Sequence, residues 1–190
     1  DLRKQAARFG TDIRFGIVTE ADLKGDLKRV VVDGEKEVLA KTVIIATGAS
    51  AKYLGLPDEA KYAGEGVSAC ATCDGFFYRK KTVAVVGGGD TACADALYLA
   101  GLCKKVYLVV RKPFLRASKI MQERTLNHEN IEVLFEHEVV GLDGDNGVAG
   151  ASLLIRRGQP DEAAGHIDID GLFLAIGHQP NTKVFAGQID

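Results

Sequence analysis

The pattern of apolar and polar residues predicts a small mixed structure at the start of the chain. Apolar residues at helical spacing indicate the end of an amphipathic helix over residues 1–9, closed by Gly10. Two strand-like runs, residues 27–32 and 38–42, flank Asp33-Gly34, a pair that favours a tight hairpin turn. We therefore expect a helix and a small antiparallel meander here, which together are not a self-sufficient core.

Two continuous apolar runs differ from these segments. Residues 42–48 and residues 172–177 each form such a run, and each ends in glycine. Continuous apolar runs are typical of strands buried on both faces of a sheet. Because the two runs bracket the middle of the chain, we expect an inserted domain. The chain would leave a first domain after Gly48 and return to it near Gly177.

The middle of the chain starts with a strand–helix–strand pattern. Residues 81–86 predict a strand, residues 92–102 a helix, and residues 105–110 a second strand. A helix over residues 119–128 is expected next, with Ser118 as its candidate N-cap.

The rest of the middle segment is rich in strand signals. Residues 131–135 predict a strand. Residues 139–142 and 148–155 flank a turn-rich connection and predict an antiparallel meander added to the parallel sheet, and residues 166–170 lead into the second apolar run. The pattern therefore predicts an α/β fold, in which a βαβ unit with an antiparallel meander is inserted into a partial second domain.

Composition narrows the possible functions. The chain has 190 residues, 46% of them hydrophobic, and its net charge of −2 gives no general attraction to nucleic acid or membranes. No apolar run approaches the roughly 20 residues of a membrane helix, and no secretory leader is visible. Four cysteines are too few for a disulfide scaffold, which fits a reducing cytoplasm. With no initiator Met and no closing element, we expect a piece of a longer protein.

The first predicted strand runs directly into a glycine-rich turn made of Gly87, Gly88, Gly89, Asp90, Thr91 and Ala92. The first glycine permits a tight turn, the third lets a pyrophosphate approach the backbone, and the alanine permits close helix–strand packing. The N-terminus of the following helix supplies N–H donors for the phosphates. We expect a dinucleotide site, with an ordinary tight turn as the alternative.

The end of the second strand indicates which dinucleotide is bound. A site for NAD places Asp or Glu about 20 residues after the glycines. Here Arg111 and Lys112 follow the strand instead, with Arg116 close behind. Three cations suit a 2′-phosphate, so NADPH is favoured over NADH. The alternative is a solvated basic loop.

A redox motif precedes the nucleotide segment. Cys70 and Cys73 are two residues apart and are followed at once by Asp74. This spacing suits an exchangeable disulfide at the start of a helix, where the backbone stabilises a thiolate, and Asp74 is placed for proton transfer. Half of a zinc site is the alternative, but the remaining cysteines, Cys93 and Cys103, lack nearby histidines at ligand spacing. We expect no metal.

Taken together, these motifs resemble the low-molecular-weight, flavin-dependent thioredoxin reductase family along the whole chain. The cysteine run is the most specific of them. The resemblance rests on residues 46–49, 67–77, 87–92, 111–117 and 175–182.

The resemblance implies a Rossmann-like βαβ nucleotide domain with an antiparallel meander, inserted into a partial second domain of the same type. It implies FAD and NADPH as cofactors, each held by its own domain. It implies a partial FAD-binding domain at residues 1–50, an NADPH-binding domain with the redox pair at 51–177, and a return segment at 178–190. It also implies that Cys73 is the cysteine closer to the flavin, with Asp74 as acid/base. The cofactor-binding residues are then the six residues of the glycine turn, the three cations, and Thr47, Gly48, Ile176 and Gly177.

The chain departs from the family pattern in places. The N-terminal glycine fingerprint of the flavin domain and its late Gly-Asp segment would lie outside this chain. Val110 and Lys112 replace the commoner His and Arg of the basic segment.

The implied activity is reduction of thioredoxin by NADPH through the flavin and the cysteine pair, in a homodimer. Both the pair and the nicotinamide need the flavin, so the resemblance also implies a domain rotation about the two chain crossings, near residues 49–54 and 177–182. The alternatives are a flavin disulfide reductase of peroxide defence, a non-catalytic NADPH-binding module and a zinc-binding structural module.

Overall fold

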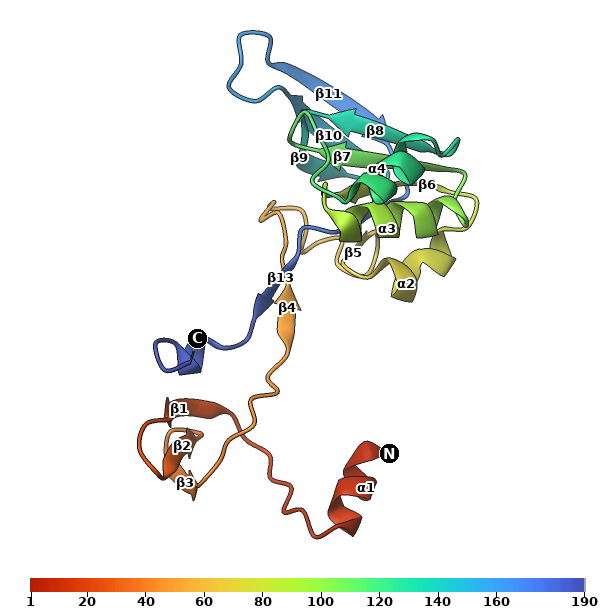
Figure 1. Ribbon diagram of the computed structural model, residues 1–190. Coiled ribbons are helices and arrows are strands. Elements are labelled where there is room, and N and C mark those ends of the chain that lie inside the picture. Colours follow the sequence, from red (N-terminus) through yellow and green to blue (C-terminus); the bar gives the residue numbers. More distant parts are fainter. Residues whose placement is uncertain (190) are drawn as a thin grey trace. The chain divides into compact units, whose positions relative to one another are not determined.

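A computed structural model describes residues 1–189 of the chain (Figure 1). The chain divides into two compact units, one made of residues 1–50 with the C-terminal segment from Pro180, the other of residues 51–179. The fold is α/β, with one parallel sheet and smaller antiparallel sheets, as expected from the sequence. No helix within residues 1–189 has the length and apolar character to cross a membrane.

A five-stranded parallel sheet forms the centre of the unit 51–179. Its strand order is β5-β12-β6-β7-β8, so the chain moves from β6 outward to β8 and then returns to place β12 between β5 and β6. The strands are β5 (Val67–Ser68), β6 (Thr82–Val86), β7 (Lys105–Val110), β8 (Ile131–Phe135) and β12 (Gly171–Leu174). The strands of the predicted βαβ pattern are confirmed.

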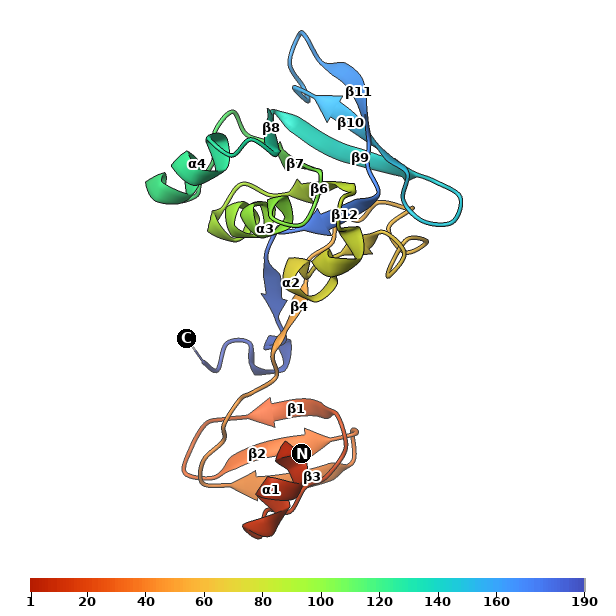
Figure 2. The same ribbon diagram turned by 90° about the vertical axis from the view of Figure 1, so that its right-hand side faces the viewer.

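Helices and a second sheet cover the two faces of the parallel sheet (Figure 2). One face carries α3 (Asp90–Ala100) and α4 (Lys119–Leu126). The other carries an antiparallel sheet of β9 (His137–Asp143), β10 (Gly150–Ile155) and β11 (Ala163–Asp168), with β10 in the middle. The predicted meander is confirmed, but it is a separate layer and does not extend the parallel sheet. Its apolar face packs on the sheet.

Strand alternation fills two cores. In β6, Val83 and Val85 belong to the core beneath the helices, whereas Ala84 and Val86 belong to the core between the two sheets. The same alternation in β12 places Phe173 on the helical side. A strand with apolar residues at every position is what a sheet covered on both faces requires. The continuous apolar run at residues 172–177 thus forms the predicted buried strand in its first part.

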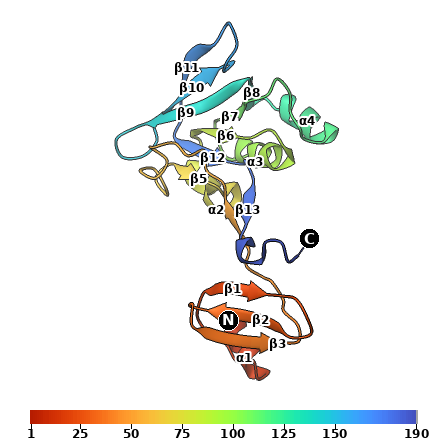
Figure 3. The ribbon, with the colours of Figure 1, turned by 90° about the vertical axis from the view of Figure 1, so that its left-hand side faces the viewer.

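The other unit is built from local elements (Figure 3). α1 (Leu2–Arg8) is followed by the antiparallel sheet of β1 (Val18–Asp22), β2 (Lys28–Val32) and β3 (Lys36–Ala40). The hairpin at Asp33 and Gly34 has φ values of 54° and 76°, as in a turn with two left-handed residues. The helix and the hairpin predicted from the sequence are confirmed.

The C-terminal segment joins this unit through η2 (Lys183–Phe185) and Gln188. The Gln188 side chain donates to the carbonyl of Ala21 over 2.8 Å and accepts from the N–H of Leu23 over 2.7 Å. These bonds link ends of the unit that are about 165 residues apart in sequence.

The prediction of a buried strand at residues 42–48 is wrong. The backbone there forms no strand until β4 (Ala49–Ala51) begins, and Ile44 is 93% exposed. A strand buried on both faces needs neighbours that supply hydrogen bonds and apolar cover. Within residues 1–189 nothing plays that part for this run.

The two places where the chain passes between the units are paired. β4 forms a two-stranded sheet with β13 (His178–Pro180). The N–H of Lys52 donates to the Gly177 carbonyl, and the N–H of Asn181 to the Gly48 carbonyl, each over 3.0 Å. The outgoing and returning segments therefore run side by side.

Candidate functional site

The predicted site residues of the unit 51–179 share one edge of the parallel sheet. Parallel strands have their carboxyl ends at the same edge. β5 ends there and leads to Cys70, β12 leads to Ile176, β6 leads to the glycine turn, and β7 leads to Arg111. With strands about 4.8 Å apart, β5 and β6 are separated by roughly 10 Å across β12. The topology thus brings the redox and nucleotide motifs to one edge.

The first glycine of the turn allows a close backbone contact. Gly87 has φ +147°, and a Cβ built there would lie 2.5 Å from the Ala175 carbonyl oxygen and 2.8 Å from the Ala92 Cβ. Only glycine fits this position without displacing β12 or the start of α3. Gly87 therefore lies where β6 and β12 separate, the switch point at which open α/β sheets bind ligands.

The turn leaves space in front of α3. A Cβ on Gly89 would meet nothing within 4 Å. Gly89 is the N-cap of α3, with extended φ and ψ of −96° and −177°. It has no side chain, so it makes no capping bond to the N–H groups of the first turn. An open α-carbon beside the free N–H groups of a helix start is suited to an anionic group such as a pyrophosphate. The turn therefore fits a dinucleotide.

The basic segment after β7 is held against this turn. The N–H of Arg116 donates to the Gly88 carbonyl over 2.6 Å. Asp90 Oδ1 accepts from both the N–H and the hydroxyl of Ser118, over 3.0 Å and 2.7 Å. These bonds hold the pKa of the Asp90 carboxyl below its usual value. The carboxylate of this predicted cofactor-binding residue is engaged by protein groups.

The prediction that Ser118 caps the following helix is right in position, but the role of its side chain differs. Ser118 does precede α4 as its N-cap residue, but its side chain makes no capping bond to that helix. Its hydroxyl bonds Asp90 in another helix instead. A partner contributed from 28 residues away in sequence was not visible in the local pattern.

The cations of the segment point outward from a buried base. Leu115 and Ala117 are each 5% exposed and join the core beneath the helices. Arg111, Lys112 and Arg116 are exposed. Free guanidinium and ammonium groups at this edge fit a phosphate on the nucleotide ribose.

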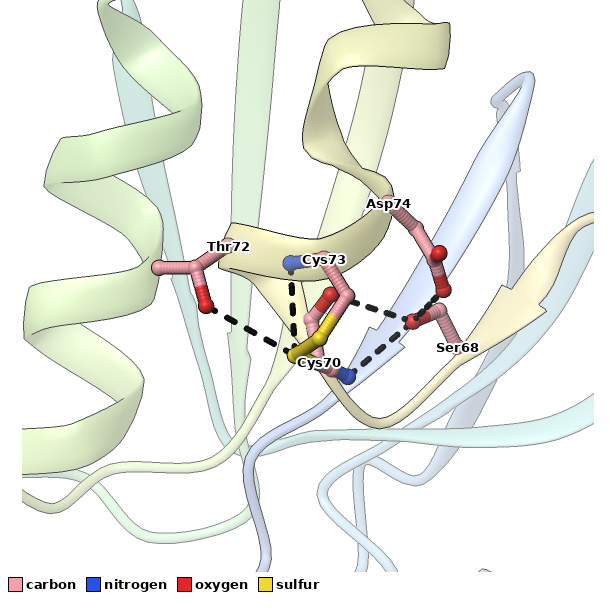
Figure 4. The surroundings of a disulfide bond; sticks show 5 residues. All are labelled: Ser68, Cys70, Thr72, Cys73 and Asp74. Carbon is pink, nitrogen blue, oxygen red and sulfur yellow. Dashed lines mark hydrogen bonds between the residues drawn. A yellow bond between two sulfur atoms is a disulfide. The ribbon is translucent and has the colours of Figure 1, made fainter. Parts of the chain in front are cut away.

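The cysteines form a disulfide at the start of a short helix, α2 (Ala71–Asp74) (Figure 4). Their Cα atoms are 5.3 Å apart. Cys70 is the N-cap residue, and its Sγ accepts a hydrogen bond from the N–H of Cys73 over 3.2 Å. The same N–H would stabilise a Cys70 thiolate once the disulfide is reduced. Cys73 is exposed and Cys70 is half-buried.

Ser68 connects the motif and was not recognised as functional from the sequence. Its hydroxyl donates to Asp74 Oδ2 over 2.6 Å and accepts from the N–H of Cys70 over 3.0 Å (Figure 4). Ser68 is 8% exposed. A serine two residues before the first cysteine, at a strand end, was the available signal. The contact orients the Asp74 carboxylate next to the cysteine turn.

Comparison with known protein families identifies the family of this chain. Residues 4–190 match the family described as pyridine nucleotide-disulphide oxidoreductase. The chain belongs to this pyridine nucleotide-disulphide oxidoreductase family.

Several relatives of the family are close in sequence and structure. Thioredoxin reductase of Streptomyces coelicolor is 42% identical over 191 residues, covering 100% of this chain and 58% of the relative. A protein of Pseudomonas fluorescens named glucosaminate ammonia-lyase is 45% identical over 193 residues, covering 99% of this chain and 58% of the relative. The structure of thioredoxin reductase from Giardia duodenalis matches with TM-score 0.84 and 34% identity, covering 100% of this chain and 61% of that one. The chain thus spans about three-fifths of these proteins.

The other predicted cofactor residues of this family member lie at the two chain crossings. The carbonyls of Thr47 and Gly48 accept bonds from the side chain and backbone of Asn181. Ile176 and Gly177 directly follow β12, and the Gly177 carbonyl accepts from Lys52. Within residues 1–50, no strand–glycine turn–helix unit is formed. These residues by themselves do not enclose a flavin.

Two further cysteines lie away from the redox pair. Cys93 and Cys103 are buried and free, at 0% and 5% exposure. Burial raises the pKa of both thiols, that of Cys103 to about 11. Both belong to the core beneath the helices. Across the described part of the chain, no three His, Cys, Asp or Glu side chains come together as a metal site.

A cavity of about 550 Å³ lies at the other edge of the parallel sheet, where β6 and β12 begin. Its walls include Glu65, Phe77, Tyr78, Lys81 and Asp170. Burial, followed by the charges of Asp74 and Asp170, raises the pKa of the Tyr78 hydroxyl. Its lining contains neither the glycine turn nor the three cations, so this cavity is not the predicted nucleotide site.

Proposed function

We propose that this protein is a thioredoxin-disulfide reductase that uses NADPH and FAD. The observation that carries the proposal is the Cys70–Cys73 disulfide on the sheet edge that also holds the glycine turn. The similarity to thioredoxin reductases along the whole chain supports it.

In this proposal the unit 51–179 holds NADPH. The turn from Gly87 to Ala92 receives the pyrophosphate at the start of α3, where the open space at Gly89 allows close approach. Arg111, Lys112 and Arg116 receive the 2′-phosphate, because they are exposed cations following β7. The domain assignment, with NADPH bound by 51–177 and FAD partly by 1–50 and 178–190, remains part of the proposal.

The flavin, when bound, supplies transfer of electrons from the nicotinamide to the disulfide. Thr47, Gly48, Ile176 and Gly177 are proposed to contact it. The paired crossings, β4 and β13, are the segments about which a rotation would exchange the two motifs at the flavin.

Thiol–disulfide exchange then falls to the chain's own residues. Two electrons and two protons convert the Cys70–Cys73 disulfide into two thiols. The Cys70 thiolate attacks a sulfur of the partner's disulfide, forming a mixed disulfide and releasing a partner thiolate, which takes up a proton. The Cys73 thiolate attacks Cys70 Sγ, which re-forms the internal disulfide and releases the second partner thiolate.

The structural basis for these roles is local. The N–H of Cys73 already donates to Cys70 Sγ, which favours a thiolate on Cys70 as nucleophile. By family resemblance Cys73 is the sulfur nearer the flavin. Asp74, oriented by Ser68, is placed to take and return the protons. Thioredoxin is the proposed partner, in the cytoplasm, with a homodimer as the proposed assembly.

The test is reduction of a disulfide dye and of thioredoxin by NADPH in the full-length, flavin-loaded protein. Cys70→Ser and Cys73→Ser should each abolish steady-state reduction, because each breaks the exchangeable pair. Cys103→Ala is the control, a cysteine outside the pair, and should keep activity. NADPH should raise the number of free thiols in each denatured wild-type chain by two, from the opened Cys70–Cys73 disulfide. Activity that survived both serine variants would contradict the mechanism.

The same assay separates the alternatives. Reduction of a peroxide-defence partner in preference to thioredoxin would favour a related flavin disulfide reductase. NADPH binding without any change in thiol number would favour a non-catalytic binding module. Ammonia release from glucosaminate, independent of Cys70 and Cys73, would favour the activity for which the Pseudomonas fluorescens relative is named.

A further inference from the structure

The basic segment, residues 111–117, is held in place by groups that carry no positive charge. The Arg116 N–H bonds the Gly88 carbonyl, and the Lys112 carbonyl accepts from the N–H of Glu136 over 3.3 Å. The Gln122 side chain donates to two carbonyls of the segment, over 2.8 Å and 3.1 Å. The backbone of the segment is therefore fixed at several points.

One further attachment joins the segment to the turn through side chains. Asp90 Oδ1 accepts both the N–H and the hydroxyl of Ser118. Asp90 is the first residue of α3 and directly follows the last glycine, and Ser118 lies two residues after Arg116. Fixing the position of Ser118 relative to the turn therefore also fixes the stem from which Arg116 projects.

The charge of Asp90 is unexpected at this place. A carboxylate beside a site for two or three phosphates repels them, and an uncharged residue would avoid that cost. The carboxylate favours the start of α3 through the helix dipole, and a charged acceptor makes stronger hydrogen bonds than a neutral one. Its engagement by both Ser118 donors indicates a structural use for the charge.

We propose that Asp90 and Ser118 form a positioning pair that sets the preference for a nucleotide with a 2′-phosphate. The pair holds the basic segment at a fixed distance from the glycine turn, so that the cations meet the 2′-phosphate when the pyrophosphate is in the turn. This inference rests on the proposed use of NADPH. Neither residue is a phosphate ligand in it.

The positioning role predicts an effect on selectivity. With the pair removed, the remaining backbone bonds and the buried Leu115 keep the segment folded, but Arg116 and its neighbours occupy more positions. Binding of the adenosine and its 5′-phosphate needs no basic segment. The loss should therefore fall on ligands that carry the 2′-phosphate.

The experiment is calorimetric titration of the full-length protein with adenosine 2′,5′-bisphosphate and with 5′-AMP, beside NADPH and NADH. Asp90→Ala should lower the affinity ratio of bisphosphate to 5′-AMP about tenfold, as expected for lost hydrogen bonds to a charged group. Ser118→Ala keeps the backbone bond and should lower the ratio by less. Asp90→Asn retains an acceptor oxygen and should restore most of the ratio.

Controls make each outcome decisive. Asp168→Asn removes an exposed carboxylate from β11 and should leave the ratio unchanged. Thermal unfolding checks that each variant is folded, and Ser118→Ala is the milder variant should Asp90→Ala unfold. An unchanged ratio in both alanine variants overturns the positioning pair. Equal tightening of both ligands by Asp90→Ala also overturns it, because Asp90 would then act by repulsion alone. A wild-type protein without preference for the bisphosphate contradicts the NADPH proposal itself.

Discussion

The two units of the molecule bury their apolar residues to different extents. In the unit 51–179, two cores lie on the two faces of one sheet, and Val83, Val85 and Leu172 are fully buried. In the other unit, Phe9 and Ile44 are 85% and 93% exposed. Both units contain apolar sequence, so composition does not explain the difference. What differs is whether the chain supplies layers on both sides.

The two glycine-ended runs show this difference at the level of one strand. Residues 172–174 of the second run lie in β12, which pairs with β5 and β6, and they are buried. Residues 42–48 have the same character and form no strand. A continuous apolar run therefore forms a buried strand only where neighbouring strands and covering layers are present.

Truncating one apolar side chain in each run should give the largest difference in the free energy of unfolding. Phe173→Ala removes a ring that is 1% exposed and packs edge-on against Tyr78, with ring centroids 5.2 Å apart. We expect a loss of about 3–5 kcal/mol in the free energy of unfolding, from lost burial and the cavity left behind. Ile44→Ala should change it by less than about 0.5 kcal/mol. Urea unfolding followed by circular dichroism measures both, and equal effects would contradict the comparison.

Replacing one glycine in each unit by alanine should give a smaller difference in stability. Gly87→Ala places a Cβ 2.5 Å from the Ala175 carbonyl, so β12 must move, and we expect a loss of about 2–4 kcal/mol and weaker NADPH binding. Gly48→Ala meets nothing within 4 Å at φ +68°, and only backbone strain of about 1–2 kcal/mol remains. Unfolding and nucleotide titration of both variants test this. A Gly48→Ala variant as unstable as Gly87→Ala would indicate packing at the crossing that the structure does not contain.

The smallest expected effect is a pH dependence confined to the well-packed unit, which contains all four cysteines. Burial raises the pKa of Cys103 from 9.0 to about 11. Between these values the folded protein holds more protons than the unfolded chain, so stability present below pH 9 is lost as pH rises towards 11. Cys103→Ala should flatten this decline in pH-dependent urea unfolding. An identical decline in the variant would assign it to other groups.

Much of the fold was predictable because its signals are local. The strand β6, the glycine turn and α3 follow each other directly, and each residue type fits the turn that it occupies. The hairpin at Asp33-Gly34 was predictable for the same reason. The redox pair was predicted as an exchangeable disulfide from its spacing alone.

The parts that were not predictable depend on contacts between distant segments. The Ser118 hydroxyl had a local use as a helix cap, and only the folded chain brings Asp90 to it. Ser68 joins Cys70 and Asp74 through a geometry fixed by the end of β5. The sequence pattern of the meander is the same whether it extends the parallel sheet or packs over it. Only the folded structure shows that its apolar residues pack against one face of the parallel sheet.

The pairing of β4 with β13 has a consequence for how this kind of protein is assembled from parts. The unit between them starts and finishes at adjacent positions, since Lys52 and Gly177 are joined by one backbone hydrogen bond of 3.0 Å. A segment whose ends meet can be removed, exchanged or re-joined by a short linker while the host keeps its own geometry. The two crossings thus place the start and the end of the unit 51–179 beside each other, so a replacement unit needs only adjacent ends to join the same two segments.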